Sequence, residues 1–166
     1  MTSNLVTTQW LTEHLHTPKP AIIDASWHLP ATKRNAKDEF IARHIPGAQF
    51  YDLDAGAATN TTLPHMLPKA EKFRADMSAL GVGNQSQVIC YDAAGLFSAA
   101  RLWWMLKTFG HENVYVLDGG LHKWERDSFA LETGTAHSVP TSNFKVERNQ
   151  SKVKSIDEVS SALSSK

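Results

Sequence analysis

Three short apolar runs stand out in the pattern of hydrophobic and polar positions along the chain. Val88–Tyr91 and Val114–Leu117 are continuous and rich in β-branched residues, and Ala21–Ala25 resembles them. A strand with one solvent-facing side would alternate apolar and polar residues, and these runs do not alternate. They predict strands that are buried on both faces, as in a parallel sheet that is covered by helices.

Apolar residues at helical spacing occupy the segments around these runs. The spacing predicts helices over the ranges Thr8–His16, Pro68–Leu80, Ser98–Phe109 and Leu121–Arg126. Pro68 suits the first turn of its helix, and a glycine follows the second and third helices, where helices commonly stop. The alternation of strands and helices indicates an α/β domain, a doubly wound parallel sheet with helices on both faces.

The C-terminal part of the chain has a different composition. Residues 132–155 are rich in Ser, Thr, Gly and Pro and hold few strongly apolar side chains, which is typical of a linker or a wrapping arm. Ser155 and Glu158 then form a capping-box pattern before a further helical pattern. We expect residues 5–145 to form the domain, and residues 146–166 to be a linker and the start of a second, similar unit. The alternative is a terminal helix that packs on this domain.

Composition limits the classes of function. The 166 residues are 42% hydrophobic and 20% charged, which is ordinary for a globular domain. Lys+Arg and Asp+Glu number 17 each, so the formal charge is zero and neither nucleic acid nor a membrane surface is expected as a partner. The single cysteine cannot form an internal disulfide, which fits a cytoplasmic protein.

The loop after the strand Val88–Tyr91 has the frame of an anion-binding loop. It opens on Asp92, contains Gly95 and leads into a helix near Ser98. Such a loop presents backbone N–H groups and the positive end of a helix dipole to an anion. Asp92, however, is a carboxylate and no nucleophile. It either caps the loop, which we favour, or acts as a functional acid, and Arg101 either pairs with it or faces solvent.

Other candidate chemistries find little support in the sequence. Cys90 lies inside an apolar strand, where burial raises the pKa of a thiol and makes it unreactive. A Cys-based phosphatase loop would need an Arg where Leu96 stands. The eight His residues form no His-Glu-x-x-His pattern, so no metal ion is expected. No glycine-rich phosphate loop occurs either, and no cofactor is expected.

A long irregular segment, residues 47–68, holds the remaining polar candidates. It contains Asp52, Asp54 and His65 and shows little periodic pattern. Long irregular loops in compact domains are often functional. A carboxylate beside an imidazole orients the ring and supports proton transfer near neutral pH. The alternative interpretation is that these side chains only anchor the loop.

Trp103 and Trp104 place two large aromatic rings next to each other on one predicted helix. Adjacent helical residues point about 100° apart, so one ring should face the sheet and the other needs a different cover. That cover is either another helix of this domain or a second unit.

Several sequence blocks, in this order along the chain, carry a family resemblance: Asp24–Pro30, Phe40–Ala48, Pro64–Pro68, Ser98–Met105, Phe109–His111 and Val116–Gly120. They resemble the N-terminal half of the tandem rhodanese-type sulfurtransferases, and most of all those that use 3-mercaptopyruvate or thiosulfate. The resemblance covers about residues 5–145. It implies a rhodanese-like fold and a parent protein in which a second rhodanese-like domain is the partner of this one.

The resemblance also implies roles for individual residues. In this family the second domain carries the Cys that becomes a persulfide, and Asp92 stands at the equivalent position of this half. Asp54 and His65 match positions that are thought to assist proton transfer in a cleft between the domains. Arginines that hold the substrate carboxylate belong to the second domain. We expect Arg101, Trp103, Trp104 and the irregular segment 47–68 to lie at the face between the two domains.

The expected function follows from this resemblance. The parent protein would move sulfane sulfur from a small donor, 3-mercaptopyruvate or thiosulfate, to cyanide or a thiol. The 166 residues would be one half of that sulfurtransferase and inactive alone. The alternative is a non-enzymatic binding or regulatory module with the same fold.

Overall fold

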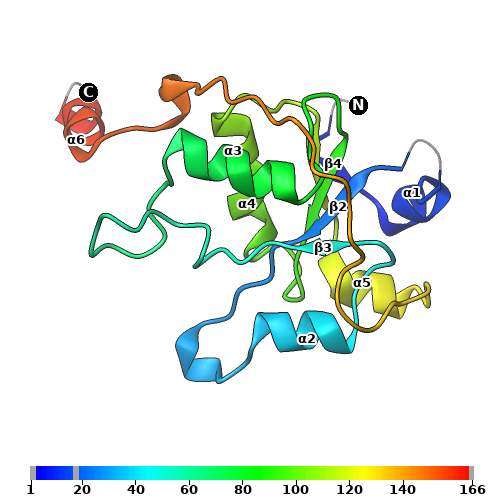
Figure 1. The fold of residues 1–166 in the computed structure, drawn as a ribbon. Helices are drawn as coiled ribbons and strands as arrows, with labels where there is room; N and C mark the ends of the chain where they lie inside the picture. The colour runs from blue at the N-terminus through cyan, green and yellow to red at the C-terminus, as the bar shows by residue number, and fades with distance from the viewer. Residues whose placement is uncertain (1–2, 17–18, 165–166) are drawn as a thin grey trace.

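The computed structural model describes residues 3–16 and 19–164 and contains a five-stranded parallel sheet with the order β1-β5-β4-β2-β3 (Figure 1). The strands are β1 (Leu5–Val6), β2 (Ala21–Asp24), β3 (Gln49–Phe50), β4 (Val88–Tyr91) and β5 (Val114–Leu117). The parallel sheet and the three longer strands were predicted. The edge strands β1 and β3 were not, because two residues are too few to show a period.

Helices cover both faces of this sheet, as the sequence predicted. The helices on its faces are α1 (Thr8–Glu13), α2 (Ala36–Ala42), α3 (Ala70–Ala79), α4 (Ala99–Thr108) and α5 (Gly120–Arg126), and the chain also contains α6 (Ile156–Ser164) and the 3₁₀ turns η1 (Pro30–Thr32) and η2 (Gln150–Lys152). In Figure 1, α3 and α4 lie on one face of the sheet and α1, α2 and α5 lie on the other. No helix within the described residues is long and apolar enough to cross a membrane.

Two helix boundaries differ from the prediction. The first helix was expected over Thr8–His16, but it ends before His14, whose Nδ1 lies 2.7 Å from the carbonyl oxygen of Trp10 while its ring stacks on the indole. The placement of Pro68 in a first helical turn was wrong, because α3 begins after the N-cap residue Lys69. The helix α2 had no counterpart in the prediction.

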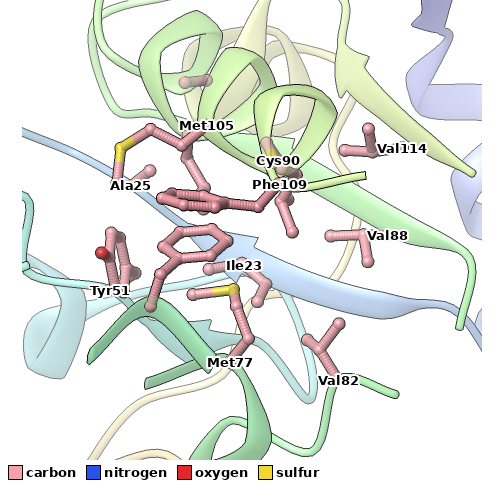
Figure 2. Close-up of a cluster of buried hydrophobic side chains, with 14 of the residues drawn as sticks. Ile23, Ala25, Tyr51, Met77, Val82, Val88, Cys90, Met105, Phe109 and Val114 are labelled. Atoms are coloured by element: carbon pink, nitrogen blue, oxygen red, sulfur yellow. The ribbon is translucent and has the colours of Figure 1, made fainter. Parts of the chain in front are cut away.

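Side chains of the central strands alternate between two cores. Ile23 and Cys90 belong to the core beneath α3 and α4 (Figure 2). In this core the ring of Phe73 stacks on that of Phe109, with the ring centroids 4.4 Å apart. The alternate residues of the same strands join the core beneath α1, α2 and α5. Burial on both faces was the basis for predicting a parallel sheet, and it is confirmed.

The irregular segment before η2 is a wrapping arm over part of its length. Phe144 is fully buried in the core beneath α3 and α4. The backbone N–H of Ser142 donates to the Ser78 carbonyl at 3.0 Å, and that of Glu147 donates to the Phe109 carbonyl at 3.0 Å. This arm therefore covers the ends of α3 and α4.

The helix α6 stands apart from the sheet at the end of this arm (Figure 1). Its predicted capping box is present, with Ser155 N–H 2.7 Å from the Glu158 carboxylate and Glu158 N–H 3.1 Å from the Ser155 hydroxyl. Its apolar side chains Ile156, Val159 and Leu163 are 83%, 49% and 70% exposed. In the structure this helix therefore does not pack on the domain.

Candidate functional site

Asp92 fills the loop that joins β4 to α4. Its side chain is fully buried, and one carboxylate oxygen accepts a hydrogen bond from Ala94 N–H at 2.9 Å. The other oxygen accepts from Ser98 N–H and Ala99 N–H, each at 2.7 Å. The capping interpretation of Asp92 is confirmed, because these N–H groups at the start of α4 are bonded to the protein's own carboxylate.

Neighbouring segments hold this loop in place. The Ser26 hydroxyl accepts from Ala93 N–H at 2.8 Å, and Leu121 N–H donates to the Asp92 carbonyl at 2.9 Å. Gly120 is needed at this contact, because a Cβ there would lie 2.4 Å from the Asp92 carbonyl oxygen and the residue has a φ of +54°. The loop is thus clamped between the end of β2 and the start of α5.

Cys90 cannot serve this loop as a nucleophile. It is fully buried in the core shown in Figure 2, and burial raises the pKa of its thiol well above the ordinary value. A buried, protonated thiol is a poor nucleophile. The structural interpretation of Cys90 is therefore confirmed.

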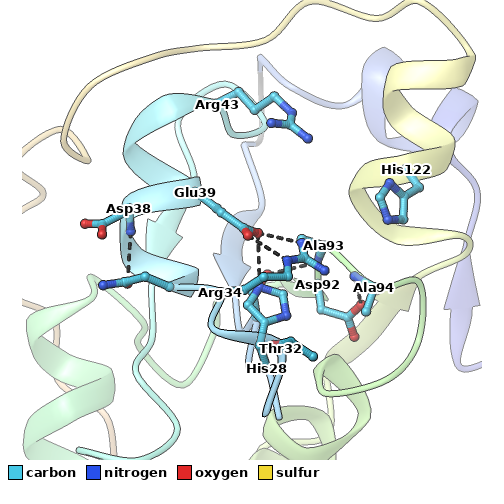
Figure 3. A network of polar contacts seen from close by, with 12 residues as sticks. His28, Thr32, Arg34, Asp38, Glu39, Arg43, Asp92, Ala93, Ala94 and His122 are labelled. Atoms are coloured by element: carbon cyan, nitrogen blue, oxygen red, sulfur yellow. Dashed lines mark hydrogen bonds and ion pairs between the residues drawn. The ribbon is translucent and has the colours of Figure 1, made fainter. Parts of the chain in front are cut away.

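A polar network, seen together with the Asp92 loop in Figure 3, joins His28 and Arg34, which lie on either side of η1, to Glu39 on α2. Arg34 donates two hydrogen bonds of 2.7 Å to the Glu39 carboxylate, and Nε2 of His28 lies 3.0 Å from the same group. The hydrogen bonds from Arg34, followed by the charge of His28, lower the pKa of Glu39 despite some desolvation. Sequence reasoning missed this network, because no spacing rule connects a loop residue to the next helix.

Asp54 and His65 come together, while Asp52 does not join them. Nδ1 of His65 lies 3.4 Å from Oδ1 of Asp54, and the two side chains are 36% and 66% exposed. The Asp52 carboxylate instead accepts from Asp54 N–H at 2.9 Å and from Ala55 N–H at 3.0 Å. Asp52 is thus a loop anchor, and Asp54 with His65 forms a carboxylate–imidazole pair that solvent can reach.

Trp27 also contacts this pair, and the sequence analysis did not single it out. Its indole N–H lies 3.1 Å from each oxygen of Asp54, and its ring meets His65 edge-on at a centroid distance of 4.9 Å. Trp27 follows β2, and residues just beyond the carboxyl ends of parallel strands meet at one edge of the sheet. That position was the signal that could have pointed to it.

Neither sequence interpretation of Arg101 is correct. Its guanidinium does not pair with Asp92 and does not simply face solvent, because it donates to the His65 carbonyl oxygen and lies 4.7 Å from the ring centroid of Trp104. Trp103 donates its indole N–H to the carbonyl of Val114 on β5 at 3.2 Å. One ring therefore faces the sheet, as predicted, and the cover of the other includes Arg101.

An apolar rim accompanies the Asp54–His65 pair. Phe97 is 55% exposed, and its ring centroid lies 6.3 Å from that of Trp27. Further exposed apolar side chains are Leu63 and Met66, on the segment 47–68, and Leu96, in the loop of Asp92. In the part of the chain that the structure describes, no group of three or more His, Cys, Asp or Glu residues is placed to hold a metal ion. The arrangement offers proton transfer beside an apolar surface.

Comparison with known proteins identifies the family of the chain. The model of the rhodanese-like domain matches residues 7–127. The chain is 40% identical to human 3-mercaptopyruvate sulfurtransferase over 98% of its own length and 56% of that protein. It is 47% identical to the mitochondrial thiosulfate/3-mercaptopyruvate sulfurtransferase 1 of Arabidopsis thaliana, over 80% of its length and 35% of that protein.

A solved structure shows the same similarity. The crystal structure of SseA from Escherichia coli, a 3-mercaptopyruvate sulfotransferase with the rhodanese fold, superposes with a TM-score of 0.90 at 42% identity. The match covers 97% of this chain and 62% of SseA. The chain spans between 35% and 56% of the length of the two relatives named above. Sheet order, loop geometry and these matches together place the chain in the rhodanese-like domain family.

Proposed function

We propose that this chain is the non-catalytic half of a two-domain sulfurtransferase. In this proposal residues 5–145 form the first domain, and residues 146–166 lead to a second rhodanese-like domain. That second domain carries the Cys that becomes a persulfide. Sulfane sulfur moves from 3-mercaptopyruvate or thiosulfate to cyanide or a thiol.

One observation carries the proposal: the loop that holds a reactive group in this fold holds Asp92 here. Its carboxylate is buried and accepts three backbone hydrogen bonds, and a carboxylate cannot accept sulfane sulfur. The thiol of Cys90 is buried beneath it. The matched part is 56% of the human sulfurtransferase and 62% of SseA, so these relatives extend well beyond it, which supports a catalytic cysteine elsewhere.

The proposed chemistry requires a proton at one step. A thiolate of the second domain attacks the sulfur of 3-mercaptopyruvate, and a sulfur–sulfur bond forms as the carbon–sulfur bond breaks. The electron pair of the broken bond stays on carbon, and the resulting enolate takes up a proton to become pyruvate. Asp54 and His65 are suited to this transfer, because the carboxylate orients the imidazole and both side chains are accessible.

The surface around this pair is suited to contact the second domain. We assign to it Arg101, Trp103, Trp104 and the segment 47–68. The exposed apolar rim at Phe97 supports this assignment, because large apolar patches usually mark interaction sites. Addition of the second domain in trans should shift the tryptophan fluorescence of this chain, and no change at saturation would count against the assignment.

Activity assays test the proposal. The 166-residue chain alone should yield only background thiocyanate from cyanide with either donor, and Cys90→Ser should not alter this. Turnover that vanished in Cys90→Ser would overturn the proposal. Joined to a catalytic rhodanese-like domain, the chain should support turnover of 3-mercaptopyruvate. His65→Gln or Asp54→Asn should then lower kcat by roughly 100-fold, whereas Asp52→Asn, which keeps the anchoring oxygen, should not.

A binding or regulatory module of the same fold is the second candidate. The observation in its favour is also the loop of Asp92, whose N–H groups are already bonded and therefore not free for an external anion. The two candidates differ in the joined protein. If the joined Asp54→Asn and His65→Gln variants kept full turnover, a binding or regulatory module would be favoured over a domain that assists catalysis.

A further inference from the structure

The Asp54–His65 pair lies on a segment that cannot fix its geometry alone. Residues 51–69 contain no helix or strand, and both side chains are substantially exposed. Exposed side-chain pairs of this kind usually sample several geometries and contribute little on their own. Proton transfer, however, needs groups that stay within hydrogen-bond reach. Residues outside the segment must therefore supply the order.

Trp27 supplies a fixed donor to the carboxylate. Its indole N–H is placed symmetrically, 3.1 Å from each oxygen of Asp54. Its own backbone N–H donates to the Ser98 hydroxyl at 3.1 Å, and Ser98 N–H is bonded to Asp92. The carboxylate is thereby tied to the clamped Asp92 loop.

The chemical nature of this donor also matters. An indole N–H is neutral, so it restrains the Asp54 carboxylate without neutralising its charge. A Lys or Arg at the same place would form a charge pair with the carboxylate and weaken its effect on the neighbouring imidazole. With Trp27 the full negative charge remains available to His65. The ring of Trp27 also packs edge-on against the imidazole, which limits its rotation.

Arg101 restrains His65, the other member of the pair. His65 has a φ of +54°, a left-handed conformation that few residues other than glycine adopt. The Arg101 guanidinium donates to the His65 carbonyl oxygen, and it lies over the Trp104 ring at 4.7 Å. Because Arg101 stands on α4, its bond ties the backbone of His65 to a rigid element.

We propose that Trp27 and Arg101 are positioning residues for the Asp54–His65 pair. Trp27 holds the carboxylate against Nδ1 of His65, and Arg101 holds the backbone from which the imidazole projects. The catalytic consequence rests on the function proposed above. The geometric part concerns the 166-residue chain itself and can be tested without turnover.

The first experiment measures the tautomer of His65 by ¹⁵N NMR in the 166-residue chain, at a pH where the ring is neutral. A carboxylate held near Nδ1 should keep the proton on that nitrogen. Trp27→Phe retains a ring but removes the donor, so the population should move toward the Nε2–H tautomer. Trp10→Phe is the matched control, because Trp10 also contacts a histidine ring, that of His14. An unchanged tautomer in Trp27→Phe would overturn the inference.

The second experiment measures kinetics in the chain joined to a catalytic rhodanese-like domain. Trp27→Phe should lower kcat for 3-mercaptopyruvate roughly tenfold with little change in KM, since a small misplacement of a catalytic group is costly. When combined with Asp54→Asn, Trp27→Phe should lower kcat no further. Arg101→Lys, which keeps the charge and loses the planar fork, should also lower kcat, whereas Arg74→Lys on the exposed part of α3 should not.

These outcomes separate the two proposals. If Asp54→Asn and His65→Gln leave kcat unchanged, the function proposed for the pair fails, and the tautomer measurement, made in Trp27→Phe and in Arg101→Lys, still decides the positioning. If those two variants lower kcat while Trp27→Phe and Arg101→Lys do not, the positioning inference fails and the proposed function stands. Equal urea midpoints of the variants and the unaltered chain would show that folding is not the cause.

Discussion

Substitution of Asp92 tests most directly whether its carboxylate holds the loop between β4 and α4. Asp92→Ala removes the acceptor of three N–H groups, and two of them, on Ser98 and Ala99, are buried. A hydrogen bond to a charged group contributes about 1.5–3 kcal/mol, so the loss of the two buried bonds should cost about 3–6 kcal/mol. A domain of this size is typically stable by about 5–15 kcal/mol, and the variant should therefore be close to unfolding.

Urea denaturation followed by tryptophan fluorescence and circular dichroism measures this cost. Asp92→Asn keeps one acceptor oxygen, so its loss should be smaller than that of Asp92→Ala and remain measurable if the alanine variant does not fold. Asp157→Ala changes an exposed carboxylate on α6 and should alter the free energy of unfolding by less than about 0.5 kcal/mol. Midpoints of both Asp92 variants equal to that of the unaltered chain would refute the argument that this carboxylate holds the loop.

Three further predictions concern other parts of the domain. With Cys90→Ser as background, Asp92→Cys should place a thiol among the loop N–H groups and lower its pKa, so its ultraviolet thiolate absorbance should appear at a lower pH than that of free cysteine; an equal or higher pH would contradict this. Burial raises the pKa of the Cys90 thiol in the folded chain, whereas the unfolded chain keeps the ordinary value of 9.0. As pH rises past this value the thiol ionises in the unfolded chain first, so the free energy of unfolding falls. Between about pH 8 and pH 10, the free energy of unfolding measured in urea should therefore fall by about 1.4 kcal/mol less in Cys90→Ala than in the unaltered chain. Equal falls in the two chains would contradict this prediction. Phe144→Ala should cost about 3–5 kcal/mol and expose the arm to limited proteolysis, while Lys145→Ala at its exposed neighbour should do neither.

The sequence predicted the parts of the fold in which local pattern and tertiary burial agree. Val88–Tyr91 is apolar at every position because it has a core on each side, and that pattern is readable without a structure. The two-residue strands β1 and β3 exist only through pairing with β5 and β2, so local sequence does not reveal them. The end of α1 at His14 depends on a ring contact with Trp10, which periodicity also does not encode.

The candidate site was predictable to a similar extent. The capping role of Asp92 follows from its position before a helix, and the structure bears it out. The residues alone could not separate Asp54 from Asp52 as the partner of His65, because loop geometry decides which carboxylate meets the imidazole, whereas the family resemblance pointed to Asp54 and His65. Neither pairing with Asp92 nor simple exposure to solvent was correct for Arg101, since its partner is a backbone carbonyl in a distant loop, and no spacing rule applies to such a partner.

The short edge strands have a consequence for how this domain can associate. An open sheet edge attracts foreign strands, because its unpaired backbone groups act as a template for aggregation. Here β1 and β3 each offer a ladder of only two residues. So short a template gives little gain to an incoming strand. Self-assembly by strand addition is therefore disfavoured, and any lasting contact with another protein must come from matching side-chain surfaces.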